Sequence, residues 1–111
     1  MKAISSKRAR ACLISNATKW KVAERDSIDG YPCCIFCHSN RALPEAHYIS
    51  RANGGLGIPE NIMTVCRPCH YKFDNGTREE REEMRKQAKD YFLKHYPDWN
   101  EEKLIYGNQI K

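Results

Sequence analysis

The sequence lacks a long hydrophobic run. No stretch of apolar residues approaches the ~18 that a membrane-spanning helix requires. Basic residues stand near its start, at Lys2, Lys7, Arg8 and Arg10. No apolar segment of signal-peptide length follows them. We therefore expect a cytosolic protein with no membrane partner.

Apolar residues are also in short supply. The chain of 111 residues is long enough for one small domain and too short for two. Because only 41% of the residues are hydrophobic, the core is modest. A structural metal would add stability that burial alone does not supply.

Net charge is absent from most of the chain. Residues 27–111 hold equal numbers of acidic and basic residues. Residues 1–26 hold seven Lys or Arg against Glu24 and Asp26, and so carry the whole net charge of +5. A basic arm beside a neutral domain attracts the phosphate backbone of a nucleic acid. On charge alone, a solvated helix or a disordered tail explains the pattern equally well.

Six cysteines are present, and four of them form two Cys-x-x-Cys pairs, CIFC and CRPC. Two thiolates two residues apart on a tight turn can reach one ion, and two such pairs complete a tetrahedral zinc shell. Disulfides are disfavoured because the sequence shows no secretion signal. We therefore expect a structural Zn²⁺ site formed by Cys34, Cys37, Cys66 and Cys69.

Two cysteines, Cys12 and Cys33, fall outside this set. Cys33 adjoins Cys34 and is an alternative ligand, although the spacing to Cys37 favours Cys34. His38 directly follows the first pair. We expect an exposed loop side chain there, because four thiolates already fill a zinc shell.

The stretch between the two pairs is too long for a minimal zinc finger and carries further motifs. These read EAHYISRANGG, PENI and, at the second pair, CRPCH. In this order and at these separations they resemble the HNH endonucleases, or ββα-metal nucleases, over residues 31–76. The resemblance places His47, Asn61 and His70 at the positions of the family's motif residues.

The fold that this resemblance implies is α+β, a small zinc-stapled ββα-metal domain with flanking N-terminal and C-terminal helices. It divides the chain into three parts. These are a basic arm or helix over residues 1–26, the HNH domain over 27–76, and a helical extension over 77–111 that packs on the domain.

The resemblance also implies an activity, the hydrolysis of DNA phosphodiester bonds by nicking or double-strand cleavage, leaving a 5′-phosphate and a 3′-hydroxyl. His47 is then the general base, and Asn61 bonds across the hairpin to hold the loop that orients it. His70 and Asp74, four apart on a helix, hold a catalytic ion, either Mg²⁺ or Mn²⁺/Ni²⁺. The implied partner is double-stranded DNA. We expect a monomer or weak homodimer in the cytoplasm of a bacterium or a phage-infected host cell.

One position departs from the family pattern. The residue before the catalytic His is commonly Asp or His and binds the ion, but this chain has Ala46. Three explanations stay open: Asp74 compensates, Glu45 reaches the ion, or His47 is itself a ligand and another group is the base. Ala46 also favours a second hypothesis, a zinc-stapled nucleic-acid-binding module without cleavage activity.

Three cations flank the candidate centre, namely Arg51, Arg67 and Lys72. Cationic side chains near a scissile bond contact phosphate oxygens in nucleic-acid complexes. Each of the three is therefore a candidate phosphate contact, with an ordinary surface position as the alternative.

Local patterns predict helices on both sides of a hairpin. We expect a short helix or loose arm around residues 8–14. A second helix is expected to start from Thr18, with Trp20 and Val22 packing inward. In the first hairpin strand, alternation places Ala46 on one face and His47 on the other.

Beyond the second Cys pair, the sequence predicts a helix that ends at Gly76 and turns Phe73 toward the core. Thr77 and Glu80 form a capping box that starts a longer helix. The apolar stripe of this helix, expected to pack over the metal domain, consists of Met84, Ala88, Tyr91, Phe92 and His95.

Overall fold

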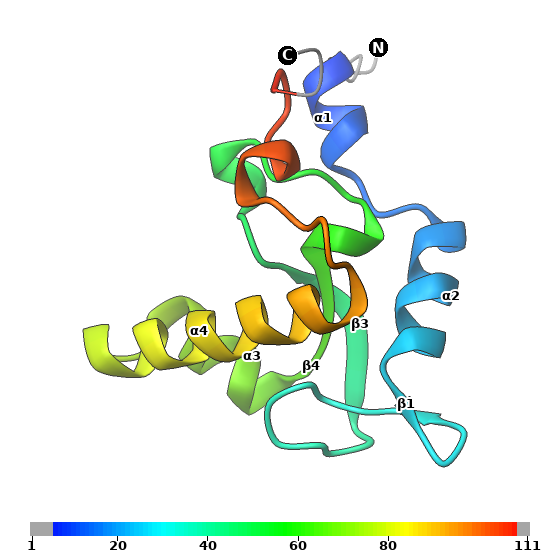
Figure 1. The fold of residues 1–111 in the computed structure, drawn as a ribbon, viewed down its shortest axis with the longest axis vertical. Coiled ribbons are helices and arrows are strands. Elements are labelled where there is room, and N and C mark those ends of the chain that lie inside the picture. Colours follow the sequence, from blue (N-terminus) through cyan, green and yellow to red (C-terminus); the bar gives the residue numbers. More distant parts are fainter. Residues whose placement is uncertain (1–5, 109–111) are drawn as a thin grey trace, which may run out of the picture.

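The fold is built around one antiparallel hairpin and the helix that follows it. The computed structural model describes residues 6–108 (Figure 1). Its elements are α1 (Lys7–Cys12), α2 (Asn16–Arg25), β1 (Ser27–Ile28), β2 (Tyr31–Pro32), β3 (Ala42–His47), η1 (Arg51–Asn53), η2 (Pro59–Asn61), β4 (Ile62–Cys66), α3 (Arg67–Asn75), α4 (Arg78–His95) and η3 (Glu101–Leu104). The α+β class is confirmed. None of these helices is long and apolar enough to cross a lipid bilayer.

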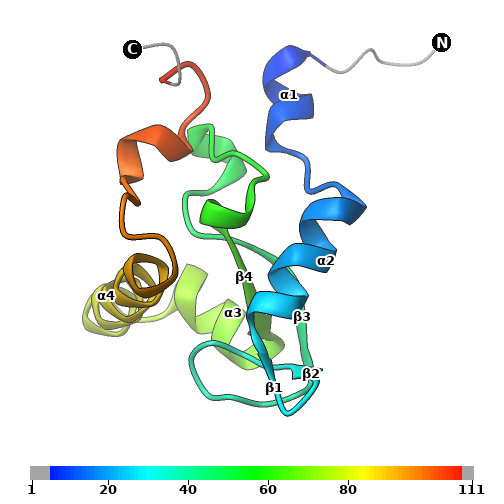
Figure 2. The same ribbon diagram turned by 45° about the vertical axis from the view of Figure 1, so that its right-hand side comes forward.

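The central hairpin pairs β3 with β4, with Ala46 opposite Met63 and His47 opposite Ile62. Every residue of β4 is buried, because helices cover both faces of the hairpin. In β3 the predicted alternation is confirmed: Ala46 is buried, whereas His47 is half-buried on the other face. In both views α2 lies on one side of the hairpin and α4 on the other (Figures 1 and 2).

The helix α3 follows β4 without a loop and turns Phe73 into the core, as predicted. The helix α4 begins at the predicted capping box, in which Thr77 and Glu80 exchange hydrogen bonds between side chain and backbone. The apolar stripe of α4 that packs in the core is narrower than predicted. Met84, Ala88 and Phe92 are buried, whereas Tyr91 is half-buried and His95 is exposed.

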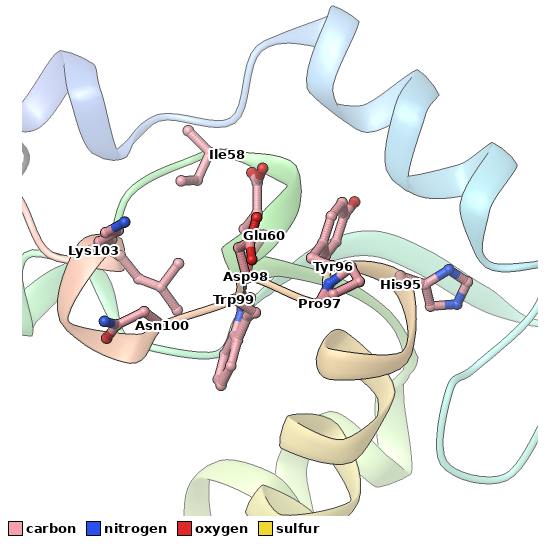
Figure 3. A pocket seen from close by; sticks show the side chains of 10 residues that line it. Ile58, Glu60, His95, Tyr96, Pro97, Asp98, Trp99, Asn100 and Lys103 are labelled. Atoms are coloured by element: carbon pink, nitrogen blue, oxygen red, sulfur yellow. Dashed lines mark hydrogen bonds between the residues drawn. The ribbon is translucent and has the colours of Figure 1, made fainter.

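The chain after α4 folds back over the core. The Trp99 ring stacks on Phe92, with centroids 5.4 Å apart and an interplanar angle of 5°. Its Nε1–H donates to the Glu60 carbonyl oxygen at 2.7 Å. A cavity of about 420 Å³ lies between this segment and η2, and Glu60, Asp98 and Lys103 are among its lining residues (Figure 3).

Three segments that are distant in sequence meet at one end of the molecule. They are α1, the loop of residues 50–57 after β3, and η3 (Figures 1 and 2). Gly57 N donates to the Ala11 carbonyl oxygen at 3.0 Å, and Leu56 N donates to the Leu104 carbonyl oxygen at 2.8 Å. The loop after β3 is thus held by the chain on both sides.

Two expectations for α2 were wrong. The helix begins at Asn16 rather than near Thr18, because the Ser15 hydroxyl accepts the Thr18 N–H and caps it. Trp20 does not pack inward, since 78% of it is exposed. Val22 fills the inward position with 0% exposure, and a residue two positions earlier lies about 200° around the helix.

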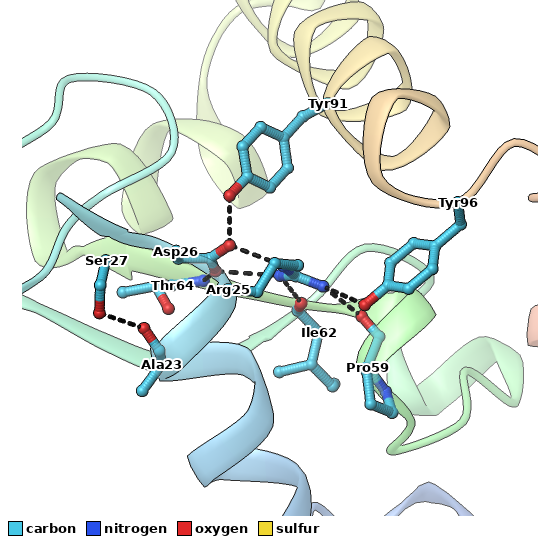
Figure 4. Close-up of polar contacts among 9 residues, drawn as sticks. All are labelled: Ala23, Arg25, Asp26, Ser27, Pro59, Ile62, Thr64, Tyr91 and Tyr96. Atoms are coloured by element: carbon cyan, nitrogen blue, oxygen red, sulfur yellow. Dashed lines mark hydrogen bonds and ion pairs between the residues drawn. The ribbon is translucent and has the colours of Figure 1, made fainter.

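A buried ion pair at the end of α2 ties it to the hairpin (Figure 4). Arg25 Nε lies 2.7 Å from Asp26 Oδ1, and Asp26 Oδ2 accepts the Thr64 N–H at 3.0 Å. Arg25 also donates to the Ile62 carbonyl oxygen at 2.7 Å. The Tyr91 hydroxyl of α4 donates to Asp26. One carboxylate therefore joins α2, β4 and α4.

We expect Asp26→Ala to lower the free energy of unfolding by about 3–5 kcal/mol, because it leaves the Arg25 guanidinium buried without its counter-charge. Urea denaturation measures this. Asp90→Ala is the control, since Asp90 is exposed and its pair with Lys86 spans 3.6 Å. That change should cost under ~1 kcal/mol. Equal losses in the two variants would contradict the role of Asp26.

Candidate functional site

Four cysteines gather where the loop after β2 meets the junction of β4 and α3. Their Sγ atoms all lie within 4.8 Å of one another, and Cys37 Sγ is 3.5 Å from Cys66 Sγ. Zn–S bonds of about 2.3 Å in a tetrahedron place neighbouring sulfurs about 3.8 Å apart, so this spacing suits zinc. The structure thus brings together Cys34, Cys37, Cys66 and Cys69, which can bind a structural Zn²⁺ ion.

Cys33 lies outside this cluster, with its Sγ 3.2 Å from a carbonyl oxygen of β2. The turn that carries the first pair is closed by the His38 N–H, which donates to the Cys34 carbonyl oxygen at 2.8 Å. The His38 side chain is exposed, as expected. Burial raises the pKa of the Cys66 and Cys69 thiols, and a bound zinc ion would hold both sulfurs as thiolates.

The strand β3 ends at His47, whose Nε2 lies 2.9 Å from the Cys12 carbonyl oxygen. Because a carbonyl oxygen only accepts, Nε2 carries the proton in the neutral ring and Nδ1 keeps the lone pair. Burial lowers the pKa of His47; the bond to Cys12 opposes this, and the charges of Arg51 and His70 add to it. The ring is thus held neutral, with Nδ1 able to accept a proton.

Backbone contacts of residues 11–14 with the loop after β3 position the Cys12 carbonyl. The Gly57 N–H donates to Ala11, and a Cβ added at Gly57 would lie 1.9 Å from the Leu13 carbonyl oxygen. No side chain fits there without moving backbone. The partner of His47 therefore depends on a close approach that only glycine allows.

We expect Gly57→Ala to push residues 11–14 away and release His47 Nε2, at a cost of about 1–3 kcal/mol in stability. Histidine ¹⁵N NMR spectra should then lose the pure Nε2–H tautomer of His47. Gly30→Ala is the control, because Gly30 has a positive φ of 88°, so an alanine there is strained, yet it sits in open space away from His47 and should leave the His47 tautomer unchanged. An unchanged His47 tautomer in Gly57→Ala would show that the contact does not position the ring.

The helix α3 brings His70 and Asp74 together on one face, as their spacing predicts. His70 Nε2 lies 3.3 Å from Asp74 Oδ2, and both side chains are about half exposed. Donors at this separation can bind one divalent ion at about 2.1 Å each. Across residues 6–108, no third His, Cys, Asp or Glu joins them in a potential metal cluster. Water or a phosphate would complete the shell of such an ion.

His70 and Arg67 line a cavity of about 420 Å³ beside β3, whose other lining residues are Leu43, Glu45, Ala46 and Val65. Ala46 gives this wall no donor atom. The Glu45 carboxylate lies 3.5 Å from Lys19 Nζ, so an ammonium group already neighbours it. His47, the next residue of β3, does not line this cavity, but it lies close enough to His70 for the charge of His70 to lower its pKa.

The three candidate phosphate contacts do not lie together. Arg67 lines the cavity with His70, and Arg51 is exposed in η1, just after β3. Lys72 lies about 200° around α3 from His70. It lines a different groove, beside Cys37. The structure therefore separates Lys72 from the other two.

Asn61, the last residue of η2 and the one before β4, is completely buried. Its Oδ1 accepts the Ile49 N–H at 2.8 Å, and its Nδ2 donates to the carbonyl oxygens of Ile49 at 3.1 Å and Leu56 at 2.8 Å. An ordinary turn asparagine would be exposed. This amide instead ties both ends of the loop that follows His47.

Sequence reasoning missed the contribution of residues 11–14. Any residue can supply a backbone carbonyl, so the sequence does not indicate that the Cys12 carbonyl binds His47. Cys12 was noted only as a cysteine outside the zinc set. The glycines of the loop were a partial signal, since they indicate a close backbone approach without naming the approaching segment. Only the folded chain identifies that segment as the end of α1.

Comparisons with known proteins do not assign a family. No family model matches the chain, and searches of curated proteins and of solved structures return no match.

Proposed function

We propose that this chain is a metal-dependent endonuclease of the HNH type, which hydrolyses DNA phosphodiester bonds and leaves a 5′-phosphate and a 3′-hydroxyl. The observation that supports this most is the state of His47. Its Nε2 is bound to the Cys12 carbonyl, its pKa is lowered, mainly by burial, and Nδ1 remains as a base. The sequence β3–β4–α3 with the cysteine cluster then corresponds to the ββα-metal unit that the motifs resemble.

In this proposal, His47 Nδ1 takes the proton from the water that attacks phosphorus. Asn61 holds the loop of residues 49–56, so the strand end that carries His47 is fixed during the reaction. Arg51, in η1 just after β3, and Arg67, which lines the cavity with His70, contact phosphate oxygens of the bound strand.

The donor set on α3 fits a divalent ion, because one imidazole nitrogen and one carboxylate oxygen face each other. His70 and Asp74 would hold Mg²⁺, Mn²⁺ or Ni²⁺, whose charge stabilises the transition state and the departing oxygen. Of the explanations for Ala46, compensation by Asp74 gains support from the pair with His70. Glu45 loses support, because Lys19 neighbours its carboxylate.

The test is a supercoiled plasmid incubated with the purified zinc-loaded protein and Mg²⁺, Mn²⁺ or Ni²⁺ in turn. We expect nicked circles first, since one chain offers one catalytic centre, and linear DNA only after a second visit or from a dimer. End-labelling should reveal 5′-phosphates. Plasmid that stays supercoiled with every ion would refute cleavage.

A second function deserves the same assay, a zinc-stapled nucleic-acid-binding module without cleavage. Two observations favour it: Ala46 offers no ligand, and only two protein donors meet on α3. Such a module would retard the plasmid in a gel yet leave its topology unchanged.

The pH dependence of cleavage follows from the direction of the His47 shift. The neutral ring is the active base, and burial, followed by the charges of Arg51 and His70, lowers its pKa below the ordinary 6.5. Cleavage should therefore be constant above pH 7 and fall tenfold per unit only when the pH drops below that lowered pKa. Initial nicking rates between pH 4.5 and 8 measure this. A rate still rising above pH 7 would contradict His47 as the base.

A further inference from the structure

The helix α2 presents a tryptophan to solvent. Trp20 is 78% exposed, more than any other large hydrophobic side chain of residues 6–108. An aromatic side chain of this size can bury roughly 150–250 Å² in a contact, so covering Trp20 would be favourable. Val22 holds the opposite, inward face of the same helix with 0% exposure, so Trp20 has no role in the core.

Two lysines flank Trp20 in the sequence of α2, Lys19 and Lys21, and Lys19 Nζ lies 3.5 Å from the Glu45 carboxylate. Glu24, one turn along the helix from Trp20, is the only acidic residue of α1 and α2. Asp26, just beyond α2, is engaged with buried Arg25. Residues 1–26 carry a net charge of +5, so this part of the chain is complementary to a polyanion.

The same face lies beside the candidate centre. The helix α2 packs along β3, and Lys19 Nζ lies 3.5 Å from the Glu45 carboxylate. Glu45 lines the cavity that also contains His70 and Arg67. A nucleic-acid strand bound on α2 would therefore lie next to that cavity, because Glu45 both contacts Lys19 and lines the cavity.

We infer that α2 is a binding surface for single-stranded nucleic acid, with the Trp20 ring stacked on an unpaired base and the lysines beside it near the phosphates. Stacking requires a free base face, which a closed duplex does not offer. The inference rests on the proposed function for its choice of partner. It deepens that function by favouring DNA with an unpaired segment, such as a flap or a bubble, over intact duplex.

Tryptophan fluorescence tests this directly, because Trp20 and Trp99 are the only two tryptophans. Trp99 is stacked on Phe92 and serves as an internal reference. We would titrate the His47→Ala protein, without divalent ions, with an oligothymidylate and with a hairpin duplex of equal length. Quenching should occur with the single strand, and Trp20→Phe, which keeps Trp99, should lose the quenching but retain most of the affinity.

Trp20→Ala should weaken binding of the single strand roughly ten- to hundredfold, and binding of the duplex by less than twofold. The matched control is Tyr31→Ala, because Tyr31 is 64% exposed on β2 and lies outside the basic residues 1–26. It should leave both affinities unchanged. Polarisation of labelled oligonucleotides measures these values.

Three results would overturn the inference. Trp20→Ala could bind the single strand as the parent protein does, or lose affinity equally for single strand and duplex. Alternatively, it could change the sedimentation coefficient of the free protein, which would make α2 an interface between two copies. Because these measurements involve no cleavage, plasmid that stays intact would refute the nuclease proposal while leaving Trp20-dependent binding as a separate result.

Discussion

His47→Ala should lower the rate of plasmid nicking by at least ~100-fold, because positioned general bases contribute about 10²–10⁴ in rate. Among residues 6–108, no other histidine combines partial burial, a lowered pKa and a ring nitrogen bound to a backbone carbonyl. Initial rates at saturating divalent ion measure the effect. Zinc content and the circular dichroism spectrum should match those of the parent protein.

A second variant separates loss of the base from loss of structure. His47→Gln retains an amide N–H that can donate to the Cys12 carbonyl, yet it offers no titratable nitrogen. It should be as inactive as His47→Ala and more stable. His95→Ala is the control, since His95 is exposed on α4 outside the site, and it should nick at the parent rate. If either His47 variant nicked at the parent rate, another group would have to be the base.

The elements predicted correctly from sequence are those whose cause is local. Two Cys-x-x-Cys turns need only four sulfurs at a fixed spacing, and the structure gathers them. The capping box of Thr77 and Glu80 satisfies two helix N–H groups within one turn. Alternation along β3 follows from the pleat, so it placed Ala46 inward and His47 outward before any packing was known.

The predictions failed where packing against a segment distant in sequence determines which side chains are buried. Trp20 and Val22 lie about 200° apart on a helix, so only one of them can face the core, and the packing of α2 against the hairpin selects Val22. In the sequence, Arg25 and Asp26 are two adjacent charged residues with no sign that they are buried. The pair is buried only because β4 and Tyr91 supply its partners.

The candidate site divides in the same way. The spacing of His70 and Asp74 fixed their meeting on α3, because residues four apart share a helix face. The same helical geometry separates Lys72 from them, which proximity in sequence concealed. The tautomer of His47 depends on a carbonyl 35 residues upstream, and no pattern of side chains could have revealed it.

Loss of one cysteine of the cluster should unfold the protein. Structural zinc contributes about 10–16 kcal/mol of apparent binding free energy in small domains, and a domain of this size has a total stability of only about 5–15 kcal/mol. The cluster also joins the loop after β2 to the β4–α3 junction, which no disulfide replaces within residues 6–108. Cys34→Ala should therefore abolish zinc binding, measured by atomic emission, and eliminate the cooperative thermal transition.

The neighbouring cysteine supplies a matched control for this prediction. Cys33 is buried like Cys34 and adjacent to it, but its sulfur points to a β2 carbonyl outside the cluster. Cys33→Ala should keep one zinc per chain and cost under ~2 kcal/mol, the effect of a small cavity. The reverse result, with zinc lost from Cys33→Ala and kept by Cys34→Ala, would exchange the two sulfurs in the site. Zinc retained in both variants would mean that Cys33 and Cys34 can replace each other as ligand. The Cys-x-x-Cys spacing would then not determine which sulfur binds the ion.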